Sequence, residues 1–436
     1  MKFLYADSLD FVDPRYDFIA DRSPNGREVY WDDLYPHEIL GYAPYDGLLV
    51  SHAIVMNGKY TLPQAMRFRL VGAREFLRFP EEKYPDSWIF GDSGAFSYHD
   101  QVEPPHSVDD MVEFYGEGGF THGCSVDHVI FEYDEKARGL NGGTQEARRR
   151  FEITLDNAEK FLHAAKPLGN RFTPVGVIQG WSPESMAVAA EKLQAMGYKY
   201  LAAGGMANLR SPAIHACLDA IGEKLRPDMG LHLLGFAKAD QIHEFTRHHI
   251  TSFDSTSPLI RAFKDHKFNY FLPGSNGSLR YYIAIRIPQA LENNTLKRLV
   301  KYGRITQERL IQLERNALDS VRGYDRGKIG LEQTLDATTK YAEILLTDPD
   351  PDASPVPERT LLTLRQRYQH TLEEQPWKEC NCAICSKISV EVAIFRSSNR
   401  NKRRGIHNLH VYYQHIKASE GSVKIEPETQ ANLFCH

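Results

Sequence analysis

The sequence lacks long apolar runs, and it contains few cysteines. No stretch of its 436 residues approaches the ~18 uninterrupted apolar residues of a membrane span. The N-terminus becomes acidic at Asp7, before the apolar core of a signal peptide can form. Six cysteines are too few for a disulfide scaffold in a chain of this length. These absences predict a cytoplasmic protein of a reducing compartment, with no membrane partner.

An excess of positive charge is also missing. The chain has 52 basic and 57 acidic residues, which gives a net charge of −5. Apolar residues make up 42% and charged residues 25%, as in ordinary soluble proteins, which excludes a disordered or fibrous chain. A mildly acidic protein does not bind nucleic acid through bulk charge. Any contact with a polyanion must therefore use a local basic patch.

Short apolar runs alternate with longer amphipathic segments up to about residue 260. Helical patterns cover 144–165 and 183–196, and the second begins with Ser182 as N-cap and a proline in the first helical position. Strands that alternate with helices indicate a parallel sheet, and seven or eight such units predict a (β/α)8 TIM barrel over residues 1–274. Residues 1–45 show no clear period. The predicted strands are 47–51, 88–92, 123–127, 172–180, 200–205, 231–235 and 252–254.

The remaining chain has a different character. Leucines at helical spacing among charged residues predict a helical insertion over 275–346. Acidic and proline-rich residues from Asp348 to Pro357 predict a stiff linker. Residues 347–436 are therefore expected to contain this linker, a zinc-binding subdomain and a C-terminal helix.

Three cysteines lie close together in an otherwise cysteine-poor chain. Cys380, Cys382 and Cys385 form a C-x-C-x-x-C element, which lets one turn direct three thiolates at a tetrahedral ion. The fourth ligand must come from farther along, and His407, His410 and His415 compete for that place. Three thiolates and one imidazole fill the coordination of zinc, so the ion would be structural. The alternative is three ordinary cysteines without metal.

Polar residues stand where the predicted strands stop. In a barrel those ends meet at one rim, where catalytic groups collect. Two aspartates that face one pocket can divide the work, one attacking a sugar carbon and the other handling protons. A carboxylate and an amide also suit the edge of a purine-like base, and an aromatic ring can stack on it. Taken singly, each residue has a plainer interpretation as a cap, a satisfied amide or core packing. The set is Asp92, Phe96, Asp127, Gln179, Gly204, Gly205 and Asp254.

Several of these residues sit in motifs that resemble those of the tRNA-guanine transglycosylases. Asp92-Ser93-Gly94-Ala95-Phe96 resembles the Asp-Ser-Gly-Gly-Phe motif of that family. The matches keep the family order from residue 90 to residue 415. The other matching motifs are Val177-Ile178-Gln179-Gly180, Ala203-Gly204-Gly205-Met206, Phe253-Asp254, the cysteine cluster and Ile406-His407-Asn408-Leu409.

The resemblance implies a barrel with a zinc subdomain and an exchange of guanine for a 7-deazaguanine base. It implies that Asp254 is the nucleophile toward C1′ and that Asp92 is the general acid/base. Asp127 and Gln179 would hold the base edge, with the backbone at Gly205 and Met206. Phe96 would stack on the base. The resemblance also implies that Cys380, Cys382, Cys385 and His407 are the zinc ligands.

The departures from the family pattern concern the substrate more than the chemistry. The basic stretch that follows the nucleophile in the tRNA enzymes is replaced here by Ser257-Pro258-Leu259-Ile260-Arg261. The interval to Cys380 is long, and Ala95 replaces a motif glycine. These features are more similar to the DNA-modifying DpdA group, which implies insertion of 7-cyano-7-deazaguanine into DNA. Transglycosylation of tRNA is the alternative. A need for accessory proteins and a homodimer both stay open.

A basic cluster lies between the cysteines and His407. Arginines and a lysine without an intervening acid predict a phosphate-binding loop, whereas the plainer interpretation is a solvated loop. Lys297, Arg298, Lys301 and Arg304 add positive charge on the insertion. A barrel glycoside hydrolase or nucleosidase, and a non-catalytic nucleic-acid-binding protein, are the rival classes. The predicted phosphate-binding residues are Arg396, Arg400, Lys402, Arg403 and Arg404.

Overall fold

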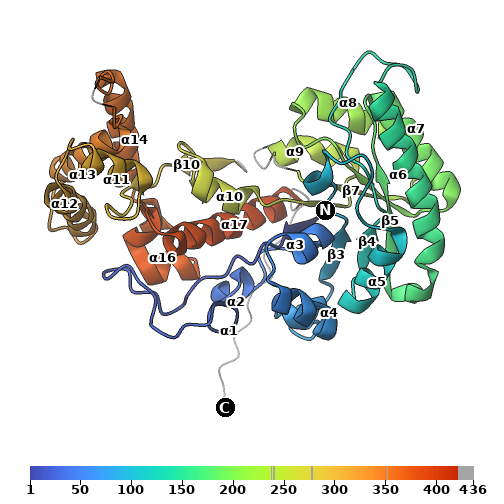
Figure 1. Cartoon of the computed structure of the whole chain (residues 1–436), viewed down its shortest axis with the longest axis horizontal. Helices are drawn as coiled ribbons and strands as arrows, with labels where there is room; N and C mark the ends of the chain where they lie inside the picture. The colour runs from blue at the N-terminus through green and yellow to red at the C-terminus, as the bar shows by residue number, and fades with distance from the viewer. Residues whose placement is uncertain (237, 239–240, 276–277, 351, 421–436) are drawn as a thin grey trace, which may run out of the picture.

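Eight parallel strands close into a barrel in sequence order, which confirms the predicted TIM barrel (Figure 1). The structure is a computed structural model that describes residues 1–236, 238, 241–275, 278–350 and 352–420. In a barrel of this kind, the carboxyl ends of the strands form the catalytic rim. The strands are β1 (Lys2–Ala6), β2 (Gly47–Ser51), β3 (Trp88–Asp92), β4 (His122–Cys124), β5 (Thr173–Ile178), β6 (Tyr200–Ala203), β7 (Gly230–Leu233) and β8 (Ser252–Asp254).

Helices cover the outside of the barrel (Figure 1). Ser182 accepts a hydrogen bond from the Ser185 amide, so the expected cap begins its helix, and Thr144 caps the other helix by accepting one from the Ala147 amide. Both predicted helices are confirmed, and the second keeps its predicted bounds. The helices are α3 (His52–Asn57), α4 (Leu62–Phe76), α5 (Val108–Gly118), α6 (Gln145–Ala164), α7 (Pro183–Met196), α8 (Ser211–Gly222), α9 (Ile242–Phe245) and α10 (Ser257–Lys264).

Strand β1 closes the barrel, and the sequence did not predict it. Leu4 lies opposite Gly47 of β2 on one side and Asp254 of β8 on the other. Leu4 packs inside the barrel, whereas its neighbours Phe3 and Tyr5 belong to the larger core outside it. A single strand of five residues gives too short a pattern to be recognised when a long irregular segment follows. That segment, residues 7–46, contains only α1 (Val29–Asp32) and α2 (Pro36–Leu40).

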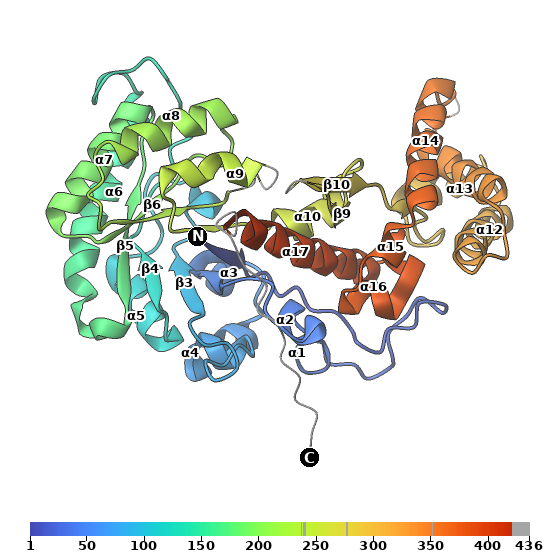
Figure 2. The ribbon, with the colours of Figure 1, turned by 180° about the vertical axis from the view of Figure 1, so that it is seen from behind.

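The chain beyond the barrel forms a mixed region and then a helical one. The predicted helical insertion, 275–346, begins instead with a strand, β10 (Leu279–Tyr282), which pairs antiparallel with β9 (Tyr270–Pro273) just before that stretch. β11 (Ile285–Arg286) pairs in parallel with β12 (Ile394–Phe395). Helices α11–α14 lie at the end of the molecule away from the barrel (Figures 1 and 2). The helices are α11 (Asn294–Lys301), α12 (Gln307–Asp325), α13 (Leu331–Leu346), α14 (Glu358–Glu374), α15 (Pro376–Glu379), α16 (Ala383–Ile388) and α17 (Ser398–Glu420).

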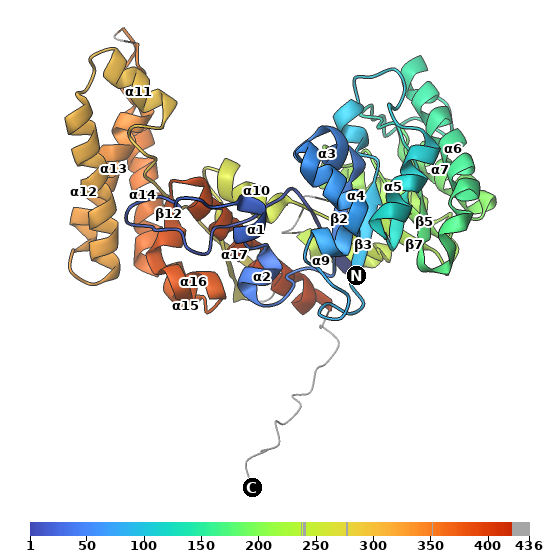
Figure 3. The same cartoon turned by 60° about the horizontal axis from the view of Figure 1, so that its bottom comes forward.

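Helix α17 runs between the barrel and this outer region, and residues 7–46 pass along it (Figures 2 and 3). The predicted phosphate-binding residues Arg400, Lys402, Arg403 and Arg404 lie on this helix, not on a loop. Arg400, Arg403 and Arg404 have at most 1% of their surface exposed. The prediction that this cluster binds phosphates at the surface is therefore wrong.

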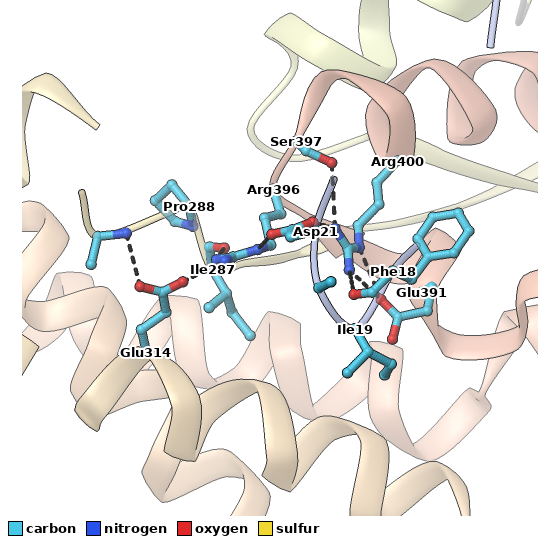
Figure 4. A network of polar contacts seen from close by, with 12 residues as sticks. Phe18, Ile19, Asp21, Ile287, Pro288, Glu314, Glu391, Arg396, Ser397 and Arg400 are labelled. Carbon is cyan, nitrogen blue, oxygen red and sulfur yellow. Dashed lines mark hydrogen bonds and ion pairs between the residues drawn. The ribbon is translucent and has the colours of Figure 1, made fainter. Parts of the chain in front are cut away.

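The arginines of this cluster bind groups within the chain. Arg396 pairs with Asp21 and Glu314, and Arg400 pairs with Asp21 and Glu391 (Figure 4). Arg403 donates to the Asp13 carbonyl at 2.7 Å, and Lys402 donates to the Leu9 carbonyl at 3.3 Å. Arg404 donates to the carbonyls of Ala262 and Val392 at 2.7 and 3.1 Å. Buried cations are retained only when paired and hydrogen-bonded, and residues 7–46 supply three of these partners, Leu9, Asp13 and Asp21.

We expect Arg400→Met to lower the free energy of unfolding by roughly 2–3 kcal/mol, because Asp21 and Glu391 each lose one of two cationic partners and keep only Arg396 and Arg322. Chemical denaturation of both proteins measures the difference. Arg298→Met, at an exposed position of α11, is the matched control and should change stability little. An Arg400→Met variant as stable as the wild type would show that the network contributes nothing to the fold.

Candidate active site and metal centre

The carboxyl ends of five strands bring the predicted site residues to one cavity of about 230 Å³. Asp92 ends β3 and Asp254 ends β8, while Asp127, Gln179 and Gly204-Gly205 follow β4, β5 and β6. Phe96 also lines the cavity, whereas Met206 is buried beside it without lining it. The cavity is smaller than the ~300–1,000 Å³ sites of drug-sized ligands, so it suits a compact planar molecule.

Asp127 and Gln179 form one hydrogen-bonded unit on the cavity wall. Gln179 Nε2 donates to Asp127 Oδ2 at 2.8 Å, and Ser93 Oγ donates to Asp127 Oδ1 at 3.0 Å. The Ile130 amide donates to Gln179 Oε1 at 3.2 Å, which fixes the orientation of the side-chain amide. Burial raises the pKa of Asp127 to about 6, although both side-chain hydrogen bonds oppose that rise.

The glycine pair after β6 makes room for this unit. A Cβ atom at Gly204 would lie 2.5 Å from Gln179 Nε2, and one at Gly205 would lie 3.0 Å from Gln179 Oε1. Gly205 also has a φ of +73°, a conformation that residues with side chains rarely adopt. The absence of side chains at these positions therefore lets the Gln179 amide occupy its place on the wall.

Asp254 is held by a histidine that the sequence analysis missed. The Gly235 amide donates to Asp254 Oδ1 at 2.8 Å, and His232 Nε2 lies 3.2 Å from the same oxygen. His232 Nδ1 lies 2.6 Å from Ser252 Oγ, which lies 2.7 Å from the Tyr200 hydroxyl. One direction of donation, from tyrosine through serine and histidine to the carboxylate, satisfies all three contacts. One feature of the sequence could have predicted this role. His232 stands between two leucines of β7 that face outward, so its own side chain must face the barrel interior.

Asp92 lies in the same cavity in a less polar environment. Its Oδ1 atom is buried without a hydrogen-bond partner among the described residues. Burial raises the pKa of Asp92 to about 7, and the nearby Asp254 carboxylate adds to the rise. A carboxyl group with this pKa can both give and take a proton near neutral pH.

Two exposed aromatic rings stand at the cavity mouth. Phe96 is 65% exposed and meets Phe131 edge-on at 5.8 Å between ring centroids. The interpretation of Phe96 as a core residue is therefore wrong. Phe131 also lines the cavity and was missed, because nothing in its local sequence distinguishes it from a packing residue.

The second predicted centre brings Cys380, Cys382, Cys385 and His407 together, with four ligand atoms within 4.8 Å of one another. The three sulfur atoms lie 3.6, 3.4 and 3.3 Å from His407 Nδ1. Zinc bond lengths and a tetrahedral angle require a separation of about 3.5 Å between such ligands. The donor set and its spacing therefore fit a tetrahedral ion.

Neighbouring groups orient the His407 ring. Its Nε2 atom lies 2.7 Å from the Phe271 carbonyl, a contact that places the proton on Nε2 and leaves Nδ1 free to bind metal. The ring stacks on Tyr270 at 4.5 Å, and the Tyr270 hydroxyl lies 3.2 Å from Cys385 Sγ. Of the three histidines that the sequence left in competition, only His407 belongs to the cluster.

The fold, the paired aspartates on one small cavity and the separate Cys3His centre together define a barrel enzyme of the transglycosylase class. The family model described as queuine tRNA-ribosyltransferase matches residues 128–424. A DNA-guanine transglycosylase of Salmonella montevideo is 38% identical over 96% of this chain and 97% of its own length. The chain therefore belongs to the queuine tRNA-ribosyltransferase family and is a pentosyltransferase.

Matches to tRNA enzymes are shorter. A queuine tRNA-ribosyltransferase of Stenotrophomonas maltophilia is 30% identical over 29% of this chain and 34% of its own length. One of Aeromonas hydrophila is 29% identical over 28% of this chain and 33% of its own length. Among the described residues, no helix is long and apolar enough to cross a membrane.

We expect Asp92→Asn to stabilise the protein increasingly as the pH rises. The folded pKa of about 7 exceeds the ordinary value of 3.8, so wild-type stability falls as the pH rises toward 7. Asparagine does not ionise, and each pKa unit corresponds to ~1.4 kcal/mol, so the gain should grow by roughly 2–3 kcal/mol between about pH 5 and about pH 8. Thermal or urea unfolding across this range measures it. Asp100→Asn, at an exposed carboxyl group, is the control, and a pH-independent gain would contradict the assigned pKa.

We expect the wild-type protein to contain about one metal ion per chain and Cys382→Ser to lose both metal and stability. Structural zinc sites contribute directly to folding, so yield and melting temperature should fall together. Elemental analysis and thermal unfolding measure the two effects. Cys217→Ser, at a buried cysteine outside the cluster, is the control. Wild-type protein without metal would refute the site.

Proposed function

We propose that this protein is a DNA-guanine transglycosylase that exchanges guanine in DNA for 7-cyano-7-deazaguanine. The observation that carries the proposal is the similarity to the Salmonella enzyme over almost the whole of both chains. The matches to the tRNA enzymes cover less than a third of this chain. The tRNA reaction with the same chemistry is the alternative.

In the first half of the reaction, Asp254 attacks C1′ of the target nucleotide. A bond forms between a carboxylate oxygen and C1′ while the bond from C1′ to the guanine nitrogen breaks. Among the described residues, both hydrogen bonds to the Asp254 carboxylate reach Oδ1, so Oδ2 remains available for the attack. His232 acts here as a positioning residue. Asp92, protonated before the step, gives its proton to the departing base.

The second half reverses these roles. Asp92, now ionised, takes the proton from the incoming base, whose nitrogen attacks C1′ and releases Asp254. Two displacements at C1′ retain the configuration of the sugar. A pKa near 7 suits a group that must change its protonation state once in each half.

The cavity wall selects the base. Asp127 and Gln179 present a carboxylate and an amide to the hydrogen-bonding edge of a purine-like ring, and Gly204-Gly205 keep that edge accessible. Phe96 and Phe131 offer exposed rings on which the base can stack. A base inside a duplex cannot reach this cavity, so the target nucleotide must be flipped out or lie in a single strand.

The Cys3His centre holds a structural zinc ion in this proposal. The residues that coordinate it leave no position for a reacting group, so the ion stabilises the region around β9 and α17. Because the arginines near α17 are buried, we propose exposed cations on α11 and just after it as contacts to DNA phosphates. These cations are Lys297, Arg298, Lys301 and Arg304.

The decisive experiment incubates the protein with labelled 7-cyano-7-deazaguanine and either duplex DNA or tRNA. We expect incorporation into DNA only. Asp254→Asn keeps the shape of the side chain but not its nucleophilicity, so incorporation should fall by at least ~10³-fold. A denaturing gel should show a protein–DNA adduct with the wild type and none with this variant.

The other outcomes separate the rivals. Incorporation into tRNA only would reassign the substrate. Release of guanine without incorporation would indicate a hydrolase or nucleosidase. DNA binding without either reaction would indicate a non-catalytic protein.

A further inference from the structure

A second and larger cavity lies in the outer region of the molecule. It has a volume of about 700 Å³, within the range of sites for cofactor-sized ligands. Its walls come from α13, α14 and the segments around β10, β11 and β12. It shares no lining residue with the active-site cavity. We call it the insertion cavity.

Three arginines line the insertion cavity, and no aspartate or glutamate does. Arg359 and Arg367 lie on α14 together with Thr363, and the spacing of four residues places all three on one face of the helix. Arg286 approaches from β11. His266 also lines the cavity.

These arginines have no carboxylate partner within the described part of the chain. Arg286 Nε is buried there without a hydrogen bond, and its guanidinium group lies 5.7 Å from the Phe395 ring. By contrast, Arg365 on the same helix pairs with Glu332 and Asp336. Like charges brought together without a counterion repel one another, so the arrangement favours an anion that binds between them.

Much of the remaining wall of the insertion cavity is apolar, although Asn269, Thr360, Thr363 and Tyr368 also line it. Leu345 and Leu346 of α13 and Leu364 of α14 face the same space, and Phe395 provides an aromatic ring beside Arg286. A ligand that fits must therefore combine negative charge with a flat apolar part. A guanidinium group recognises phosphate through paired hydrogen bonds and also stacks on planar rings.

We propose that the insertion cavity binds a phosphate-bearing nucleotide, with its phosphate among Arg286, Arg359 and Arg367 and its base on the apolar wall. The nucleotide comes either free from solution or as one unit of a nucleic-acid strand. In the second case the inference rests on the proposed function, and the insertion cavity holds a strand at a distance from the reacting base.

Calorimetric titration of the full-length Asp254→Asn protein tests this without requiring transglycosylation. The probes are thymidine monophosphate, a short oligothymidylate and inorganic phosphate, none of which offers guanine to the barrel cavity. We expect saturable binding of at least one thymidylate probe. Binding of the mononucleotide identifies a free nucleotide as the source, and binding of the oligonucleotide alone identifies a strand. Inorganic phosphate that binds as tightly as either would overturn the assignment to a nucleotide.

Two variants locate the binding. Arg359→Ala combined with Arg367→Ala should weaken it at least about tenfold, since each removes a charge-assisted contact worth more than ~1.4 kcal/mol. Thr363→Trp keeps the charges and fills the space, so it should also abolish binding. Arg365→Ala is the matched control on the same helix and should bind normally. Binding that persists in both cavity variants, or no binding of any thymidylate probe by the parent protein, would refute the proposal.

Discussion

Polar side chains along one face of α17 hold the molecule together. Arg400, Arg404 and Asn408 follow at intervals of four residues, and each is buried. Asn408 Nδ2 donates to the Pro258 carbonyl at 3.2 Å, and Arg404 donates to the Ala262 carbonyl, so both hold α10, which begins three residues after Asp254. His407, the residue before Asn408, joins the same helix to the cysteine cluster. Because the removal of one buried donor leaves its acceptors without partners, we expect the position of Asp254 to depend on these contacts between α10 and α17.

The sequence predicted those parts of the structure whose signals are local. Asp92 and Asp254 stand in short motifs directly at the end of their strands. The three cysteines lie within six residues, so their spacing alone indicates a metal site. Arg396 and Arg400 show the limit, because a run of arginines looks the same whether water or carboxylates surround it. One of their partners, Asp21, lies 379 positions from Arg400 in a segment without a periodic pattern. The sequence did not predict His232 as a site residue for a related reason. Its contact is with Asp254, which lies on the next strand of the barrel.

The active site separates the roles of two carboxyl groups through their surroundings. Asp254 Oδ1 accepts a hydrogen bond from the Gly235 amide and lies 3.2 Å from His232 Nε2, so two groups hold this oxygen in place. Burial and the neighbouring negative charge favour a proton on Asp92. The proposed reaction needs a nucleophile and a general acid in different protonation states, and the different surroundings of the two side chains support that proposal. The burial of Asp92 also lowers the free energy of unfolding as the pH rises toward 7, because the carboxyl group ionises more readily in the unfolded chain.

The arginines near α17 differ from two arginines of α14 in their partners. Carboxylates from other elements pair with the first set but not with Arg359 or Arg367 of the second. Asp21, Glu314 and Glu391 pair with Arg396, just before α17, and with Arg400 on it, so these cations are neutralised and stabilise the fold. On α14, Glu332 and Asp336 reach Arg365 but not Arg359 or Arg367, which lie on another face of the same helix. A net charge of −5 gives the protein enough carboxylates to pair more of its cations. Their exclusion from the insertion cavity therefore indicates that its positive charge is reserved for a ligand from outside the chain.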